Sequence, residues 1–300
     1  MPRSSTVSAQ TGRPYGVLLF TIVLIQLAGS LAYPVAKFGL TVIEPFTFAF
    51  FRFLLASVVL LASSAMQRHR VRVARDDYAR IIFLGVLIIP LNQTLFLLGQ
   101  SMTAAGHGAF IFGTTPIWIF VLALIHLKEP FLWRRAIGIL IALFGVTLIM
   151  VAGPVELAAQ YLLGDVIILV AVIAWGYYTV LGKPLVQKYG ALRVTAYALA
   201  SGSLIYFPFG LYQSLRYDYS QATLAAWASV VYLAVGLSMF MYVLWYWVLK
   251  HMEASRLAVY HNVQPVIATI IACVWLGEQV DTLFMVGATV VLAGVVVTEL

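Results

Sequence analysis

The side chains that could do chemistry in this sequence are polar residues set within apolar runs of about twenty residues, the length that crosses a lipid bilayer. In the first run Gln26, Ser30 and Tyr33 recur at i, i+4 and i+7, which places them on one face of a helix. Polar groups that face lipid are costly, so this face is expected to point into the protein. It could bind a polar ligand, or it could join helices by hydrogen bonds.

The densest group of polar residues surrounds two prolines, Pro116 and Pro265. Its members are Thr115, Trp118, His261, Asn262 and Gln264. Proline inside a helix removes a backbone hydrogen bond and bends the helix, so the two prolines are expected to act as hinges. The polar groups beside these bends could bind part of a ligand, and passive kinks are the alternative. Asn92 and Gln93, which follow Pro90 in another run, allow the same two interpretations.

Aromatic side chains gather in two later runs. Trp175 and Tyr178 share a helix face in one of them, and Tyr242 lies deep in the other. Such rings could stack on an aromatic or apolar ligand. Trp and Tyr also collect at membrane interfaces. Three residues near the ends of runs are assigned to such belts: Trp227, Trp245 and Trp247.

Charged residues are rare within the runs. Arg52 is the only Lys or Arg inside one, seven residues after Pro45, hence roughly 10 Å along a helix. It could bind a carboxylate or bond structurally to backbone carbonyls. Glu129 and Glu278 end their runs and are expected to cap the helices that follow. No Asp or Glu lies in the middle of a run, so an acidic proton or sodium relay is not expected, which leaves uniport or coupling through His261.

Composition indicates which elements position these residues. The 300 residues are 63% hydrophobic and 10% charged, with a mean hydropathy of +0.98, whereas a soluble domain carries about 25% charged residues. We therefore predict an all-α polytopic membrane protein. The ten predicted spans lie near residues 16–36, 45–65, 79–99, 105–126, 131–152, 164–182, 192–213, 225–249, 254–276 and 281–298.

Basic residues alternate between the loops. Fifteen of the 18 Lys and Arg residues lie in the terminal segments and every second loop, and the opposite loops hold only Lys37 and Arg216. The positive-inside rule then predicts ten spans with both termini in the cytoplasm. The net charge of +7 is explained by this orientation, and no basic stretch interleaved with aromatics indicates nucleic-acid binding. Cys273 is a lone cysteine within an apolar run, so neither a disulfide nor a metal site is expected.

The sequence contains an internal repeat. A shift of 149 residues aligns Pro116 with Pro265 and Glu129 with Glu278, and it also aligns Gly138 and Gly145 with later glycines. We therefore predict two related halves, residues 1–152 and 153–300, of five spans each. An odd number of spans per half inverts the second half in the membrane. Inverted repeats are typical of secondary transporters, in which a central site is exposed to each side in turn, although duplication kept only for packing is the alternative.

The repeat also resembles a known family. Residues 105–130, AGHGAFIFGTTPIWIFVLALIHLKEP, and residues 253–279, EASRLAVYHNVQPVIATIIACVWLGEQ, look like the repeat of the drug/metabolite transporter superfamily, EamA branch. EPFTFAFFRFLLAS at 44–57 and WGYYTVLGKPL at 175–185 extend the resemblance over nearly the whole chain. The first copy departs from the small-Gly-Glu pattern, with Lys128 before Glu129. The resemblance implies a ten-helix carrier, commonly an exporter of amino acids or related metabolites in the bacterial inner membrane.

These observations predict a cofactor-free secondary transporter that exports neutral or aromatic amino acids by alternating access. An intramembrane enzyme is disfavoured because the sequence lacks GxSG with a distant His, HExxH and paired embedded aspartates. A channel would need charged rings or a carbonyl filter, and a nucleotide-sugar or phosphate-ester carrier would need several embedded Lys or Arg. The expected partners are a small-molecule substrate and the lipid bilayer, and a homodimer stays open.

Overall fold

The computed structural model describes residues 15–67, 72–103, 105–151, 159–276 and 282–300. All regular elements in these residues are helices, which confirms an all-α architecture. Up to residue 151 they are α1 (Tyr15–Leu40), α2 (Pro45–Ala65), α3 (Arg75–Val86), the π-helix η1 (Leu87–Thr94), α4 (Leu95–Met102), α5 (Ala105–Gly113), α6 (Thr115–Leu122), the π-helix η2 (Ala123–Leu127) and α7 (Trp133–Val151).

The remaining described elements are also helices. They are the 3₁₀ turn η3 (Ala159–Tyr161), α8 (Leu162–Tyr189), α9 (Ala191–Arg216), the 3₁₀ turn η4 (Tyr219–Gln221), α10 (Leu224–Tyr232), the π-helix η5 (Leu233–Met241), α11 (Tyr242–His251), α12 (Ala254–Ala258), the 3₁₀ turn η6 (Val259–Asn262), α13 (Val263–Leu276) and α14 (Thr282–Glu299).

Eight of the described helical segments are long and apolar enough to cross a membrane. Each of them overlaps a span predicted from the sequence. The first predicted span coincides with α1, of which Tyr15–Leu31 forms a shorter apolar helix. The predicted span at 254–276 runs through α12, η6 and α13. The chain is therefore a polytopic helical membrane protein, and ten crossings stay a prediction.

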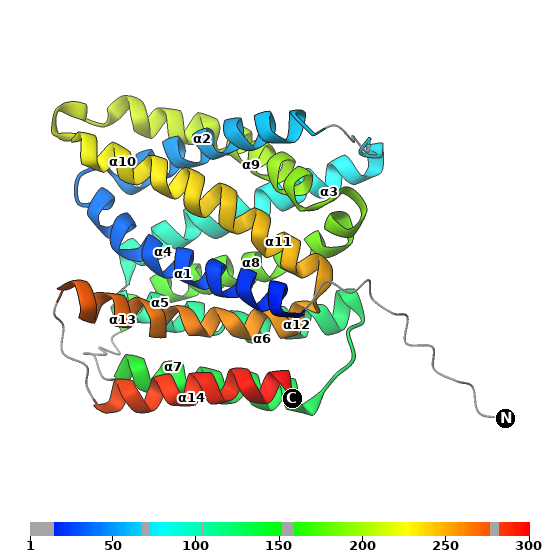
Figure 1. Ribbon diagram of the computed structural model, residues 1–300. Coiled ribbons are helices and arrows are strands. Elements are labelled where there is room, and N and C mark those ends of the chain that lie inside the picture. Colours follow the sequence, from blue (N-terminus) through cyan, green and yellow to red (C-terminus); the bar gives the residue numbers. More distant parts are fainter. Residues whose placement is uncertain (1–14, 68–71, 104, 152–158, 277–281) are drawn as a thin grey trace.

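Helices α7 and α14 pack side by side at one edge of the bundle (Figure 1). Their contact depends on glycine, because a Cβ at Gly145 would lie 2.7 Å from the carbonyl oxygen of Gly287, and one at Gly138 would lie 2.7 Å from that of Gly294. Later residues of α7 therefore face earlier residues of α14. The two helices run antiparallel with their backbones in close approach.

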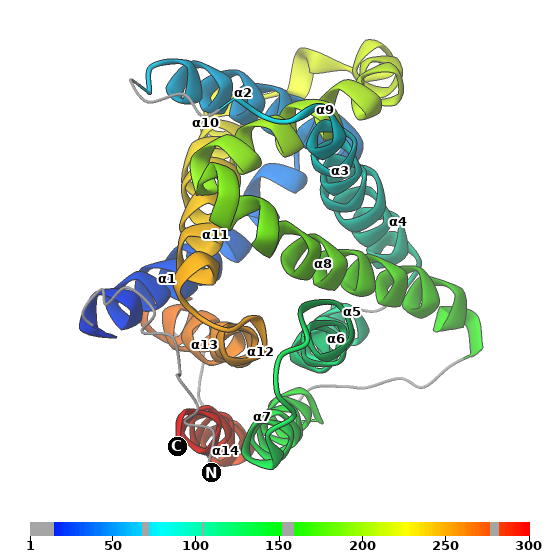
Figure 2. The ribbon, with the colours of Figure 1, turned by 90° about the vertical axis from the view of Figure 1, so that its right-hand side faces the viewer.

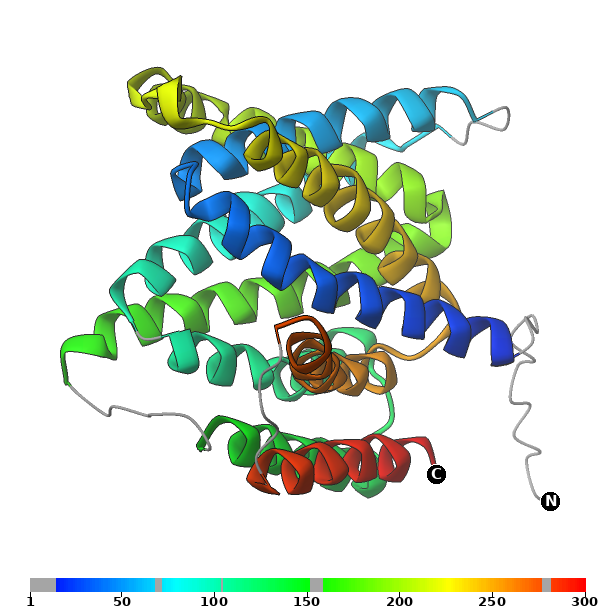
Figure 3. The same cartoon turned by 60° about the vertical axis from the view of Figure 1, so that its left-hand side comes forward.

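Helices α2 and α9 form a second antiparallel pair. Ser57 and Ser203 share a hydrogen bond of 2.8 Å between their hydroxyls, and the Tyr206 hydroxyl donates to the carbonyl oxygen of Phe46. Figure 2 shows α6 and α13 lying between the α7–α14 pair and the other helices. In Figure 3, α1 (blue) crosses α10 and α11 (yellow to orange), with which it is in contact. Helices α6, α8, α11 and α13 carry several of the predicted site residues, among them Trp118, Trp175, Tyr178, Tyr242 and Gln264.

Candidate functional site

A group of aromatic rings lies where α8, α11 and η6 meet. The ring of Trp175 lies 5.5 Å from that of Tyr178, 5.7 Å from Tyr242 and 6.0 Å from His261, measured between centroids. Trp245 lies 5.3 Å from His261 and donates through its indole nitrogen to the Thr179 hydroxyl. We name Trp175, Tyr178, Tyr242, Trp245 and His261 the aromatic cluster. Of these five residues, Trp175, Tyr178, Tyr242 and His261 were predicted from the sequence as site residues.

The position of Trp245 differs from the one predicted from the sequence. Its position near the end of an apolar run predicted a membrane-interface belt, but its side chain is 0% exposed and faces α8. The ring lies three residues after Tyr242, hence on the same face of α11. This spacing was the signal that could have assigned Trp245 to the cluster. Trp118 packs against α8 beside Trp175, since its Cβ lies 3.6 Å from the position that a Cβ at Gly176 would take, and its indole nitrogen donates to the Thr114 hydroxyl.

The cluster contains buried polar atoms that are not satisfied by protein groups. The indole nitrogen of Trp175 and Nδ1 of His261 have no hydrogen-bond partner among the described residues, and neither has the side-chain nitrogen of Asn262. A buried donor or acceptor without a partner costs about 1–3 kcal/mol. A polar ligand placed against these atoms would recover that free energy, so the cluster is chemically suited to bind a molecule with both a ring and polar groups.

A second group of polar side chains lies between α13 and α1. Both polar atoms of the Gln26 side chain and the nitrogen of Gln264 lack partners within the described chain. The Ser30 hydroxyl donates to the carbonyl oxygens of Gln26 and Gln264, at 2.8 and 3.1 Å. A Cβ at Gly29 would lie 2.6 Å from the Gln264 side-chain nitrogen, so glycine is what lets this amide lie against α1. Gln26 and Ser30 are buried, as the sequence predicted for this face of the helix. The side chain of Tyr33 lies outside the described part.

Arg52 approaches the aromatic cluster from α2. Its Nε donates to the Ser238 hydroxyl at 2.8 Å, and its guanidinium carbon lies 4.8 Å from the centroid of the Phe53 ring. It also interacts electrostatically with the Tyr242 hydroxyl. Ser238 belongs to the π-helix η5, and π-helical segments often occur at functional sites. The sequence left a carboxylate or backbone carbonyls as partners, and the observed partners are hydroxyl groups.

No carboxylate forms an ion pair with Arg52 among the described residues. The five ion pairs that are described involve other cations and lie near the ends of helices. An intramembrane cation is costly unless it is compensated. The terminal nitrogens of Arg52 are therefore suited to receive an anionic group of a ligand.

Several predicted site residues take part in helix packing instead of facing the cluster. The Asn92 amide donates to the carbonyl oxygen of Ala171 at 2.8 Å, and the Gln93 amide donates to Asn92. Asn92 thus joins η1 to α8. The Thr115 hydroxyl donates to the carbonyl oxygen of Phe112, which lies in the preceding turn.

The two predicted hinge prolines both follow a break in regular helix. Pro116 lies in the first turn of α6, directly after the interruption that separates α6 from α5. Pro265 lies in the first turn of α13, after the 3₁₀ turn η6. The fold thus places both prolines at changes of helical geometry, which is where a bend requires the least loss of hydrogen bonding.

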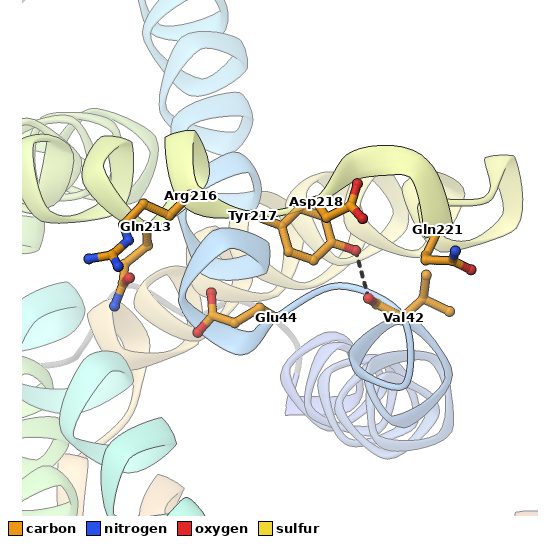
Figure 4. A pocket seen from close by; sticks show the side chains of 7 residues that line it. All are labelled: Val42, Glu44, Gln213, Arg216, Tyr217, Asp218 and Gln221. Atoms are coloured by element: carbon orange, nitrogen blue, oxygen red, sulfur yellow. Dashed lines mark hydrogen bonds between the residues drawn. The ribbon is translucent and has the colours of Figure 1, made fainter.

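A cavity of about 380 Å³ lies away from the aromatic cluster, between the α1–α2 loop and the segment after α9 (Figure 4). Tyr217 donates across it to the carbonyl oxygen of Val42 at 2.7 Å. Its carboxylates are engaged, because Glu44 accepts from two backbone amides at the start of α2 and Asp218 accepts from Ser220. Among the predicted site residues whose side chains the structure describes, none lines this cavity. We interpret it as a surface vestibule on the side of the protein whose loops carry few basic residues.

Comparisons with known proteins agree with this arrangement. The sequence profile of the EamA-like transporter family matches residues 15–151 and again residues 162–300. An uncharacterized transporter of Archaeoglobus fulgidus is 30% identical over 94% of this chain and 96% of its own length. A probable terminal-alkyne amino-acid exporter of Streptantibioticus cattleyicolor is 30% identical over 92% of this chain and 91% of its own. A solved crystal structure shares the fold with a TM-score of 0.80 and 17% identity, over 95% of this chain and 98% of that one. The chain therefore belongs to the EamA-like transporter family.

Proposed function

We propose that this transporter exports neutral, zwitterionic amino acids with large apolar or aromatic side chains, by alternating access in a bacterial inner membrane with both termini in the cytoplasm. The observation that carries the proposal is the aromatic cluster with its unsatisfied polar atoms beside Arg52, a cation without a described carboxylate partner. The substrate class is supported by one relative of similar length, the probable terminal-alkyne amino-acid exporter of Streptantibioticus cattleyicolor.

The three parts of an aromatic amino acid each have a matching group. A ring can stack on Trp175 and Tyr242, and each aromatic contact is worth about 0.5–1.5 kcal/mol beyond buried area. The carboxylate is assigned to Arg52, because a charge-assisted hydrogen bond is stronger than one between neutral groups. The ammonium is assigned to the free carbonyl oxygen of Gln26. Lysine and arginine should be poor substrates, because no described carboxylate at the cluster offers a partner for a second positive charge.

Alternating access is supported by the way the halves pack. The repeat aligns α7 with α14 and α2 with α9, and both pairs run antiparallel. Two copies of one unit that enter the membrane from opposite sides would produce such pairs. Exchange between their conformations would then expose the aromatic cluster to each side in turn, with Pro116 and Pro265 as equivalent bends.

The experiment is uptake of labelled phenylalanine, tryptophan, threonine and lysine by purified protein in liposomes. Trp175→Ala should lower transport of phenylalanine and tryptophan more than that of threonine, because threonine has no ring to stack. Trp133→Ala is the matched control, since Trp133 is 73% exposed at the start of α7. Transport of lysine at the rate of phenylalanine would contradict the substrate class. An unchanged aromatic preference in well-folded Trp175→Ala protein would contradict the pocket.

A further inference from the structure

The carboxylate of Glu129 accepts four hydrogen bonds that connect the two halves of the chain. Its Oε1 accepts from Lys183 Nζ at 3.0 Å and from the backbone nitrogen of Ala254 at 2.7 Å. Its Oε2 accepts from the Ser255 hydroxyl at 2.6 Å and from the Ser255 backbone nitrogen at 3.2 Å. The Glu129 side chain is only 6% exposed. All four donors belong to the second half, whereas Glu129 belongs to the first.

This contact differs from the sequence expectation that Glu129 caps the helix that follows it. The preceding residue, Lys128, has a φ of 54°, in the left-handed region, and this turn separates η2 from the start of α7. Glu129 instead lies at the start of α12, where its carboxylate satisfies amides that have no partner within their own helix. A carboxylate at a helix N-terminus is also favoured by the helix dipole.

Neighbouring contacts close the same side of the protein. Arg135 of α7 forms an ion pair with Glu253 and donates to the Ser255 hydroxyl. Near the end of α8, Lys188 and Tyr189 both donate to Asp77 of α3. Each contact joins the first half to the second, and each lies at the loops that carry most basic residues. On the opposite side, the described bonds between the halves run from Tyr217 to Val42, from Tyr206 to Phe46 and from Thr103 to the carboxylate of Asp165.

We propose that Glu129 is the latch of the cytoplasmic gate, which holds the start of α12 against the first half and must release it before substrate enters from the cytoplasm. The proposal rests on the alternating-access function given above. Because α12 leads directly into η6 and the predicted hinge at Pro265, movement of its first turn is transmitted to His261 in the aromatic cluster. The gate and the substrate site are thus parts of one continuous helical segment.

The test measures exposure on each side of the membrane. The reporter for the cytoplasmic side is Ala258→Cys, at the fully buried end of α12, and that for the other side is Gln213→Cys, in the surface vestibule. Both are placed in a Cys273→Ser background and labelled with a membrane-impermeant maleimide in vesicles of known orientation. Glu129→Gln removes the charge while it keeps the shape of the side chain. Loss of its charge-assisted bonds should raise the labelling rate at Ala258→Cys about tenfold or more, and labelling at Gln213→Cys should fall.

Glu44→Gln is the matched control. Glu44 also caps a helix start with its carboxylate, accepting from the backbone nitrogens of Phe46 and Thr47, but it does so within its own half. It should leave labelling at Ala258→Cys unchanged. If Glu129→Gln does not fold, Ser255→Ala removes one of the four bonds and should produce a smaller increase in the same direction.

Two results would overturn the latch. One is unchanged labelling at Ala258→Cys in folded Glu129→Gln protein, and the other is a rise at both reporters together, which would indicate general loosening. Labelling requires no amino acid, so the latch can fail while phenylalanine transport persists. Equally, the latch can hold while the substrate class proves wrong.

Discussion

Replacement of Arg52 by Gln would remove a positive charge beside the aromatic cluster and keep a hydrogen-bonding side chain toward Ser238. In the proposed site, Arg52 receives the substrate carboxylate. Its Nε donates to the Ser238 hydroxyl at 2.8 Å and its guanidinium also interacts with the Tyr242 hydroxyl, so the carboxylate would bind a remaining terminal N–H group. Arg52→Gln should therefore weaken binding of substrates that carry a carboxylate and spare those that lack one.

The size of the effect follows from the kind of bond lost. A hydrogen bond to a charged group contributes about 1.5–3 kcal/mol net, which corresponds to roughly 10- to 150-fold in Kd. A neutral hydroxyl in place of the carboxylate makes no ion pair with Arg52. Binding of such a compound should change less than that of phenylalanine, because no ion pair is lost and the glutamine amide can still donate a hydrogen bond to the hydroxyl.

The assay is binding of phenylalanine and of phenylalaninol to detergent-purified protein, measured by quenching of tryptophan fluorescence. Arg216→Gln is the control, because it removes an exposed cation at the end of α9 that is bonded to the Tyr212 hydroxyl and lies away from the cluster. Equal loss of affinity for phenylalanine and phenylalaninol in Arg52→Gln would refute the assignment, since the effect would then be structural. Unchanged affinity for phenylalanine would refute it as well.

Three further predictions concern packing, pH and the repeat. Gly145→Ala should lower the melting temperature in detergent, because the new Cβ would lie 2.6 Å from the backbone nitrogen of Val291, which cannot move aside. Such overpacking costs about 1–3 kcal/mol. An unchanged melting temperature would contradict the close approach of α7 and α14. Burial alone raises the pKa of Glu129, but Lys183 and the hydrogen bonds at the start of α12 lower this pKa below the ordinary value of 4.5. The latch should therefore hold from pH 8 down to pH 4.5 and weaken only at lower pH. Labelling at Ala258→Cys that rises as the pH falls from 8 to 6 would contradict this direction of the pKa shift. The repeat aligns Glu129 with Glu278, which lies outside the described residues. Glu278→Gln should therefore shift labelling in the direction opposite to that of Glu129→Gln. A shift in the same direction would refute the equivalence of the two halves.

The sequence predicted the helical segments well because a membrane crossing requires about twenty apolar residues, and that length is visible without a structure. It also predicted that Gln26 and Ser30 face inward, since polar groups are costly against lipid. The contacts of these residues were not predictable. Ser30 bonds to Gln264 only because Gly29 leaves room for the Gln264 amide, and that fit depends on the packing of α1 against α13.

Two errors have identifiable physical causes. Trp245 was assigned to a membrane-interface belt from its distance to the end of a run, but depth along a helix does not determine which face a side chain occupies. Glu129 was expected to cap its own following helix, but the left-handed turn at Lys128 and the tertiary packing bring it to α12. Hydrogen bonds between residues more than a hundred positions apart are set by tertiary packing, which the local pattern does not contain.

Counterflow in liposomes tests whether this protein carries neutral aromatic amino acids by exchange across the membrane. Liposomes that contain the protein are loaded with unlabelled phenylalanine and diluted into a trace of labelled phenylalanine. We expect transient, saturable accumulation of the label with phenylalanine inside, and none with lysine inside. Accumulation that is equal for both loads, or a flux that does not saturate and needs no internal substrate, would contradict it.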